Sequence, residues 1–226
     1  MDFEAYRSWL RQGRGEALTD KYIASTREYE QFLKDSRSRT LIEEASPGDF
    51  SAFEAAFDAA EGRRSFPYWY LHILYRYLEN REMADAVMDA CARRPIAAEL
   101  KMLRTTPLAL RRGLERLGIR TNLELLDAAS TPARREALAK QVDAQLEDLE
   151  TLVRMADLRR IVGVSRVVSL MEAGIDSLDA IASSTADELH QRVAAAHPGK
   201  RVNRTDYEYL PYKARFYPRW IEWPPS

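Results

Sequence analysis

The sequence predicts an all-α fold of two helical domains followed by an irregular C-terminal tail. Helix-forming residues are abundant, whereas the 226 residues include only 9 glycines and 10 prolines, which favours helices. Apolar residues recur at intervals of three and four, as they do on the buried face of a helix. Hydroxyl residues and glycines mark helix starts and ends. We expect the first domain in residues 1–95, the second in 96–196 and the tail in 197–226.

Composition restricts the classes of protein that are expected. The net charge of −1 gives no global basic field, so any attraction to nucleic acid has to be local. A single Cys91 excludes an internal disulfide and a cysteine zinc cluster. The acidic first residues are unlike a signal peptide, and no apolar run approaches the length of a membrane span. We therefore expect a bacterial-type cytoplasmic protein with no membrane partner.

The first 95 residues contain signals for four or five helices. Aromatic and aliphatic residues at helical spacing predict a helix from about 20 to 35. Ser46 followed by Pro47 is a capping hydroxyl before a proline at the first helical position, and Ser65-Phe66-Pro67 predicts another start. Two stripes are expected to face inward, namely Phe50, Phe53 and Phe57, and then Tyr68, Leu71, Leu74, Tyr75 and Leu78.

This order of residues resembles the core-binding domain of tyrosine recombinases and phage integrases, a SAM-like helical bundle. The resemblance covers about residues 2–90 and rests mainly on core positions: Tyr6…Leu10, Tyr22-x3-Thr26-x2-Tyr29-x2-Phe32-Leu33, Leu41-x3-Ala45-x-Pro47-x-Asp49-Phe50-x2-Phe53, and Ser65 followed by Leu71-x2-Leu74-Tyr75-x-Tyr77-Leu78. In that family the domain clamps DNA opposite a catalytic domain. The catalytic Arg…His-x-x-Arg…Tyr series is absent here, so strand cleavage is not expected.

Residues 96–196 contain two unequal repeats. Residues 114–121 align with residues 170–177, displaced by 56 positions. Each copy has a glycine just past a helix, Gly118 or Gly174, where a left-handed residue is needed. Each then has hydroxyl residues where the following helices begin, and in the second copy Thr185-x-x-Glu188 predicts a capping box. Between the copies, residues from Pro132 to about Met155 are expected to form one long helix.

This region resembles a bacterial family of uncharacterised function built from a divergent pair of helix-hairpin-helix units. The resemblance extends from about Lys101 to Val193, through Gly118-Ile-x-Thr121-x3-Leu125-Leu126-x4-Thr131-Pro132-x2-Arg135-x2-Leu138-Ala139, Met155-Ala156-Asp157-Leu158-x-Arg160-Ile161-x-Gly163-Val164 and Leu170-x-Glu172-Ala173-Gly174-Ile175-Asp176-Ser177. Hairpins of this kind hold nucleic-acid phosphates by backbone amides.

The chemistry of the second hairpin also follows from its residues. Gly163 is expected to permit a turn that a side chain would obstruct. The amides that follow point outward at a helix start, where an anionic phosphate oxygen fits and nearby arginines add charge. Such contacts give affinity that is independent of base sequence and falls with salt. The predicted DNA-binding residues are Arg159, Arg160, Gly163, Val164, Ser165 and Arg166, with Arg111 and Arg112 from the first copy.

Two departures keep a second interpretation open. Ser165 stands where familiar hairpins have a second glycine, and the first copy has Pro107 at its turn. Paired hairpins with one degenerate member also serve packing or protein contacts. The functional hypotheses are therefore a non-catalytic protein that contacts DNA backbone phosphates, and a structural adaptor that contacts other proteins. Arginines converging on one face would favour DNA, and arginines paired with carboxylates would favour the adaptor.

The tail combines aromatic rings with cations, having six Lys and Arg against three acidic residues in 197–226. Rings that stack on bases would make it a nucleic-acid strap, whereas rings packed on the domains would lock them together. His72, His190 and His197 are scattered, and no phosphate-binding glycine loop or nucleophile signature is present. The sequence therefore predicts no enzyme, no cofactor and no metal site, and it does not predict the oligomeric state.

Overall fold

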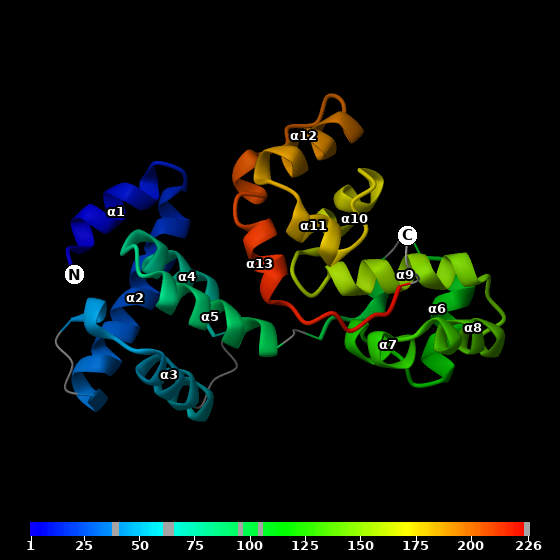
Figure 1. The fold of residues 1–226 in the computed structure, drawn as a ribbon, viewed down its shortest axis with the longest axis horizontal. Coiled ribbons are helices and arrows are strands. Elements are labelled where there is room, and N and C mark those ends of the chain that lie inside the picture. Colours follow the sequence, from blue (N-terminus) through cyan, green and yellow to red (C-terminus); the bar gives the residue numbers. More distant parts are fainter. Residues whose placement is uncertain (38–40, 61–65, 95–96, 104–105, 224–226) are drawn as a thin grey trace. The chain divides into compact units, whose positions relative to one another are not determined.

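A computed structural model describes residues 1–37, 41–60, 66–94, 97–103 and 106–223. Within these ranges the chain forms thirteen α-helices and three short 3-10 helices, and no β-strand, which confirms the all-α prediction (Figure 1). The chain divides into two compact units, Met1–Arg93 and Arg94–Ser226. Residues 197–223, predicted as a separate tail, belong to the second unit.

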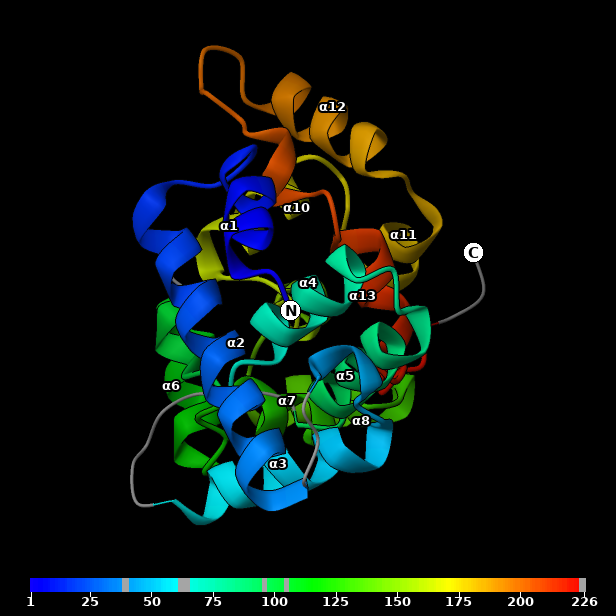
Figure 2. The same ribbon diagram turned by 90° about the vertical axis from the view of Figure 1, so that its left-hand side faces the viewer.

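The first unit is a bundle arranged around its longest helix. Its helices are α1 (Phe3–Arg11), α2 (Glu16–Arg37), α3 (Pro47–Ala59), α4 (Tyr68–Tyr77) and α5 (Arg81–Arg93), with a 3-10 turn at Ile42–Glu44. Helices α1, α3 and α4 lie against α2, and α5 packs on α3 and α4 (Figures 1 and 2). The predicted start at Ser46 is confirmed, because Ser46 and Asp49 form a capping box. Ser65 of the other predicted start lies outside the described residues, as does Pro95, the last residue of the predicted first domain.

Aromatic side chains form the core of the first unit. Tyr29 and Tyr75 are fully buried, and the Tyr75 hydroxyl donates to the Tyr29 hydroxyl oxygen at 3.1 Å. Burial raises the pKa of Tyr29 to about 12 and raises the pKa of Tyr75 further, since both phenolates would lack water. Phe50 and Phe53 of the predicted stripe are also buried. The recurring aromatic residues of this half therefore serve packing.

The second unit is built from two copies of one helical pattern. Its helices are α6 (Leu108–Arg116), α7 (Asn122–Ala128), α8 (Pro132–Gln141), α9 (Leu146–Leu158), α10 (Val164–Glu172), α11 (Leu178–Ser183), α12 (Ala186–Ala196) and α13 (Leu210–Phe216), with 3-10 turns at Leu100–Met102 and Arg204–Asp206. Helix α10 begins and ends 56 residues after α6. The chain leaves α13 as an extended segment that runs toward α7 and α9 (Figure 1).

Turn chemistry confirms the equivalence of the two copies. Gly118 after α6 has φ +81°, and Gly174 after α10 has φ +69°. In both copies the next amide reaches back five residues, from Ile119 to the Leu114 carbonyl and from Ile175 to the Leu170 carbonyl, which is the Schellman arrangement. The following helices start at the predicted capping residues, which are Thr121, Thr131, Ser177 and Thr185.

The prediction of one long helix from Pro132 to Met155 was wrong. Helix α8 ends at Gln141 and α9 begins at Leu146. Asp143 takes a left-handed conformation with φ +52°, and the Ala144 amide donates to the Ala139 carbonyl at 3.0 Å. A further Schellman-type ending therefore occurs here, with Asp143 in place of glycine. The break places Val142 against Gly113 of α6, where an added Cβ would lie 2.8 Å from the Val142 Cβ.

The prediction of an irregular tail was wrong for part of residues 197–226. Leu210–Phe216 form α13, which packs on α11. Leu210, Pro211 and Ala214 are the buried residues of this helix. Extended backbone follows in residues 217–223, called the strap below.

Candidate functional site

Gly163 forms the turn before α10, but its backbone has no need of glycine. It is the residue before the helix, with φ −70° and ψ 159°, a conformation open to any L-residue. An added Cβ would meet no atom within 4 Å, so the predicted obstruction by a side chain was wrong. Pro107 occupies the equivalent position before α6 with φ −51° and ψ 132°. Proline can replace glycine there because both copies use a negative φ.

The amides at the start of α10 are only partly available. Arg166 and Val167 both donate their amides to the Gly163 carbonyl, at 3.0 and 3.1 Å. The amides of Val164 and Ser165 donate to no acceptor of the described chain. Ser165 is exposed and lies inside the first turn rather than at the capping position. Two of the three predicted amides thus remain free at this helix start.

Arg160 is not available to a ligand. Its side chain has no exposed surface and lies 2.5 Å from the Asp157 carboxylate. It also donates to the Pro218 carbonyl at 3.0 Å and stacks 4.1 Å from the centre of the Trp220 ring. Burial raises the pKa of Asp157, and Arg160 opposes this rise. In place of the predicted phosphate contact, Arg160 therefore joins the turn after α9 to the strap.

The other predicted arginines do not form a free cationic cluster. Arg159 donates to the Val162 carbonyl at 3.0 Å, and Arg166 pairs with Asp206 at 3.1 Å. In the first copy, Arg111 donates to the Lys101 carbonyl at 3.3 Å, and Arg112 is exposed. Two of the five arginines, Arg160 and Arg166, thus pair with carboxylates. Arg104, a further arginine near the Pro107 turn, lies outside the described residues.

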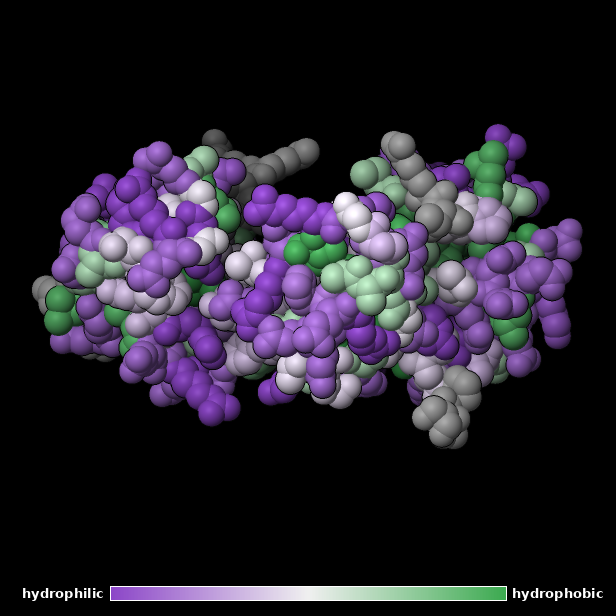
Figure 3. All heavy atoms as spheres, turned by 90° about the horizontal axis from the view of Figure 1, so that it is seen from above, coloured by the Kyte–Doolittle hydropathy of each residue, from purple (hydrophilic) through white to green (hydrophobic). Residues whose placement is uncertain are grey.

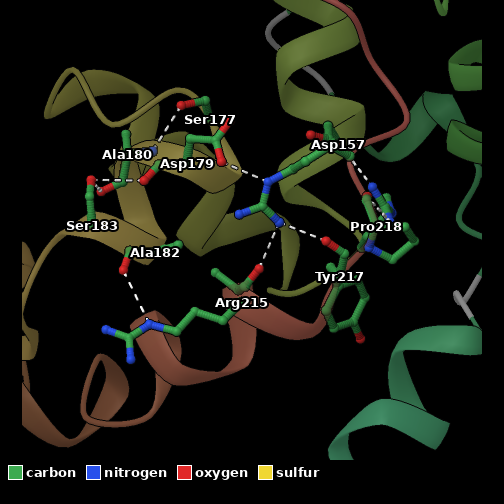
Figure 4. Close-up of polar contacts among 12 residues, drawn as sticks. Asp157, Ser177, Asp179, Ala180, Ala182, Ser183, Arg215, Tyr217 and Pro218 are labelled. Atoms are coloured by element: carbon green, nitrogen blue, oxygen red, sulfur yellow. Dashed lines mark hydrogen bonds and ion pairs between the residues drawn. The ribbon is translucent and has the colours of Figure 1, made fainter.

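The aromatic tail packs on the second unit. Tyr207 and Tyr217 are buried, and the Trp223 ring lies near the guanidinium groups of Arg135 and Arg154, at 4.5 and 4.0 Å from its centre. Figure 4 shows the chain after α13 beside α11 and Asp157. The tail was predicted either to stack its rings on nucleic-acid bases or to pack them on the helices, and these contacts are packing contacts.

Arg135 anchors the strap and was missed by the sequence interpretation. Its side chain is fully buried and donates to the Ala129 carbonyl at 3.2 Å and the Glu222 carbonyl at 2.9 Å. The Glu222 amide in turn donates to the Ser130 carbonyl at 2.8 Å. A charged residue at a helical core position was the available signal, because a buried arginine needs several acceptors. Its acceptor 87 positions away could not be read from local spacing.

An open pocket of about 430 Å³ lies between Trp220 and the C-terminal part of α7. It is lined by Leu123, Leu126, Asp127, Ser130 and Trp220. The Asp127 side chain makes no ion pair with the described residues, whereas its backbone carbonyl accepts from Arg134 at 3.0 Å. The pocket therefore joins apolar walls to an exposed carboxylate. Hydrophobic groups elsewhere form small patches on a mainly hydrophilic surface, on the face that Figure 3 shows.

Each of the three histidines lies close to a polar group of the fold. His72 is buried, with Nδ1 3.1 Å from the Ala84 carbonyl oxygen, and His190 Nε2 lies 3.1 Å from the Val202 carbonyl oxygen. His197 lies 3.2 Å from the Glu172 carboxylate. Across the described ranges, no group of three or more His, Cys, Asp or Glu side chains has a metal-binding arrangement. Nor does any described helix have the length and apolar character needed to cross a membrane.

Comparison with known families supports treating the repeats and the strap together. Residues 109–221, half of the chain, match the family described as Domain of unknown function (DUF4332). The chain belongs to this family. The DUF4332 match begins within α6 and ends in the strap, so it includes the segment that was predicted as a separate tail. No curated protein and no solved structure matches the chain.

The two resemblances stated from the sequence remain predictions. The DUF4332 description names no activity or ligand. Residues 1–108 lie outside the match, so nothing in it bears on the integrase-like bundle. Within that bundle, Lys34 pairs with Glu30 at 2.9 Å and Arg27 lies over the Phe3 ring. Both cations belong to α2.

Proposed function

We propose that the chain is a non-enzymatic helical adaptor whose second unit binds another protein. The main support is that two of the arginines predicted to bind phosphate instead pair with carboxylates of the chain. Arg160 is buried against Asp157, and Arg166 pairs with Asp206. Free cations near the hairpin amides would strengthen a phosphate contact, but Arg160 and Arg166 are held by carboxylates. The pocket on α7 adds apolar surface that a protein partner would cover. A cytoplasmic location belongs to the same proposal.

Affinity capture with the full chain tests this proposal. The tagged chain is used as bait in a cell extract of its source, with and without nuclease, and captured proteins are quantified by mass spectrometry. A directly bound protein should be enriched equally in both samples, and it should bind again as a purified component. Loss of every partner after nuclease treatment would contradict the adaptor, since nucleic acid would then be the bridge.

A DNA contact at the start of α10 is the second candidate. The free amides of Val164 and Ser165 favour it, because helix starts attract anionic oxygens. Fluorescence anisotropy with a labelled DNA duplex at low salt provides the test. Arg159→Glu and Arg166→Glu should abolish any binding that uses this turn, with Arg201→Glu in the exposed loop after α12 as the control. Substitution of Arg160 is uninformative here, because its side chain is buried.

A further inference from the structure

Helix α6 has an outer surface on which cations outnumber acids. Residues 108–120 contain four arginines and one glutamate. Leu108, Arg112 and Arg116 follow one another at intervals of four, so they lie on one side of α6. Both arginines are exposed, and Leu108 keeps 54% of its surface in solvent. These three residues, with the exposed Arg120 in the turn before α7, are called the α6 face below.

The three arginines of the α6 face are not committed to acceptors of the chain. Across the described ranges, none of them makes an ion pair or a side-chain hydrogen bond. Glu115, the one glutamate of this segment, is exposed and pairs with none of them. Glu99 pairs instead with Lys101 at 2.6 Å, and Glu124 accepts two backbone amides at 2.8 Å. The carboxylates that are close in sequence therefore leave these guanidinium groups in solvent.

The second copy has the opposite charge at the equivalent positions. By the 56-residue displacement, Arg116 and Arg120 correspond to a glutamate and an aspartate. Each of these acids has a basic partner within the chain. The pairs are Glu172 with His197, at 3.2 Å, and Asp176 with Arg154, at 2.7 Å.

The first copy has no charged residue at the positions of these basic partners. The same displacement places Gln141 at the position of His197 and Ala98 at the position of Arg154. One copy thus satisfies both charged positions from within the chain, whereas the other leaves them to solvent or to another molecule.

The aliphatic side chains beside the arginines indicate the kind of molecule that fits. Leu108 lies next to Arg112 on α6, and Leu117, which follows Arg116, keeps 48% of its surface in solvent. A nucleic-acid backbone would contact the arginines but would leave these alkyl groups without apolar partners. A protein segment that combines carboxylates with apolar side chains would cover both kinds of residue.

We propose that the α6 face binds an acidic segment of another protein, whose carboxylates pair with the arginines and whose apolar side chains cover Leu108 and Leu117. The proposal rests on the adaptor function and names the chemistry of the partner. Arginine suits this contact, because its guanidinium fork binds a carboxylate through two parallel hydrogen bonds. The affinity should fall as salt rises, since salt screens exposed charges.

Peptide selection on the full-length chain tests the proposal. Phage-displayed random peptides of about 12 residues are the probe, and enriched peptides are synthesised, labelled and titrated by fluorescence anisotropy. The expected consensus combines several Asp or Glu residues with leucine or aromatic residues. Arg112→Glu and Arg116→Glu should each raise the Kd about three- to tenfold, because they replace attraction by repulsion. Leu117→Ser should raise it about two- to fivefold, because an apolar contact is lost.

A charge swap separates a direct contact from an effect on the helix. Arg116 lies in the last turn of α6, where a cation also stabilises the helix. Each acid of a selected peptide is therefore replaced by lysine in turn, and one of these peptides should bind Arg116→Glu more tightly than the original peptide does. A purely structural role of Arg116 would give no such recovery. Arg201→Glu makes the same charge change in the exposed loop after α12 and should leave the Kd unchanged.

Several outcomes would overturn the proposal. They are an absence of enriched peptides, a consensus without acidic residues, and equal binding of the peptides by the wild type and Arg116→Glu. Tighter binding of a labelled DNA duplex or of phosphatidylserine vesicles than of the peptides, lost in Arg116→Glu, would assign the α6 face to phosphate instead. A dimer of this chain that Arg116→Glu abolishes would assign it to a second copy.

The two proposals can fail separately. Captured proteins that bind Arg112→Glu and Arg116→Glu as well as they bind the wild type would leave the adaptor in place and remove the α6 face as its site. Complete dependence of capture on nucleic acid would remove the adaptor itself.

Discussion

Gly163 and Gly174 stand at the two ends of α10 and differ in what their backbones require. Gly163 has φ −70° and open space around an added Cβ, whereas Gly174 has φ +69°. Serine at 163 gains a capping hydroxyl and restricts the unfolded chain, so Gly163→Ser should stabilise by about 0.5–1 kcal/mol. Gly174→Ser should destabilise by about 1–2 kcal/mol, because L-residues are disfavoured at that φ. Urea unfolding monitored by circular dichroism measures both changes.

Gly118→Ser is the control for the comparison of Gly163→Ser with Gly174→Ser. It has φ +81° with no neighbour near an added Cβ, so Gly118→Ser should lose stability through backbone strain alone. A loss of more than about 1 kcal/mol in Gly163→Ser would contradict the prediction and indicate that the hairpin turn needs glycine after all.

Replacement of Arg160 should lower the free energy of unfolding by an amount that depends on pH. The raised pKa of Asp157 means that the folded state holds its proton more tightly than the unfolded state. This contribution favours folding below the ordinary carboxyl pKa and is lost as pH rises through the folded pKa. Arg160→Gln removes the main opposing charge and raises that pKa further. The loss of unfolding free energy should be about 3–5 kcal/mol at pH 7 and smaller at pH 4.

Chemical unfolding of the wild type and Arg160→Gln at pH 4 and pH 7 measures this difference. Arg204→Gln serves as the control, because Arg204 pairs with Asp187 in full solvent and exposed pairs contribute little. An equal loss at both pH values would mean that Arg160 acts through Pro218 and Trp220 rather than through the charge of Asp157.

At the scale of elements, the helix boundaries that depend on local chemistry were predictable. Thr121 and Thr185 cap their helices as expected, because a cap involves residues three positions apart. The break at Asp143 was not predictable, since the apolar stripe continues through it and no glycine or proline marks it. The roles of Arg160 and Trp220 also depend on contacts some 60 residues apart. Patterns within one helix carry no information about such partners.

Arg135 should hold the strap in place on the second unit. Arg135→Met would leave the carbonyls of Ala129 and Glu222 without their donors, which should cost about 2–4 kcal/mol of unfolding free energy. Arg135→Lys should recover only part of this loss, because one ammonium cannot reproduce the guanidinium fork. Hydrogen exchange should show faster exchange of the Glu222 amide, which bonds to Ser130. The exchange of α2 amides in the first unit should stay unchanged.

Arg134→Met is the matched control for this prediction, because Arg134 is the exposed neighbour of Arg135. Within the part of the chain that the structure describes, its guanidinium bonds to Asp127 and Ser130, at the end of α7. Equal loss in the two variants would mean that Arg135 stabilises α8 rather than the strap.

At the scale of the whole molecule, the two compact units predict that the fragment 94–226 folds without residues 1–93. Its length is within the usual range of independent domains. Circular dichroism should show cooperative urea unfolding of 94–226, whereas the fragment 94–196, ending at the boundary predicted from sequence, should lose cooperativity. The shorter fragment lacks Pro218, Trp220 and Glu222, so the guanidinium groups of Arg135 and Arg160 lose their strap acceptors and ring contact, and buried donors without acceptors are unfavourable. Cooperative folding of 94–196 would show instead that the paired repeats are complete without the tail.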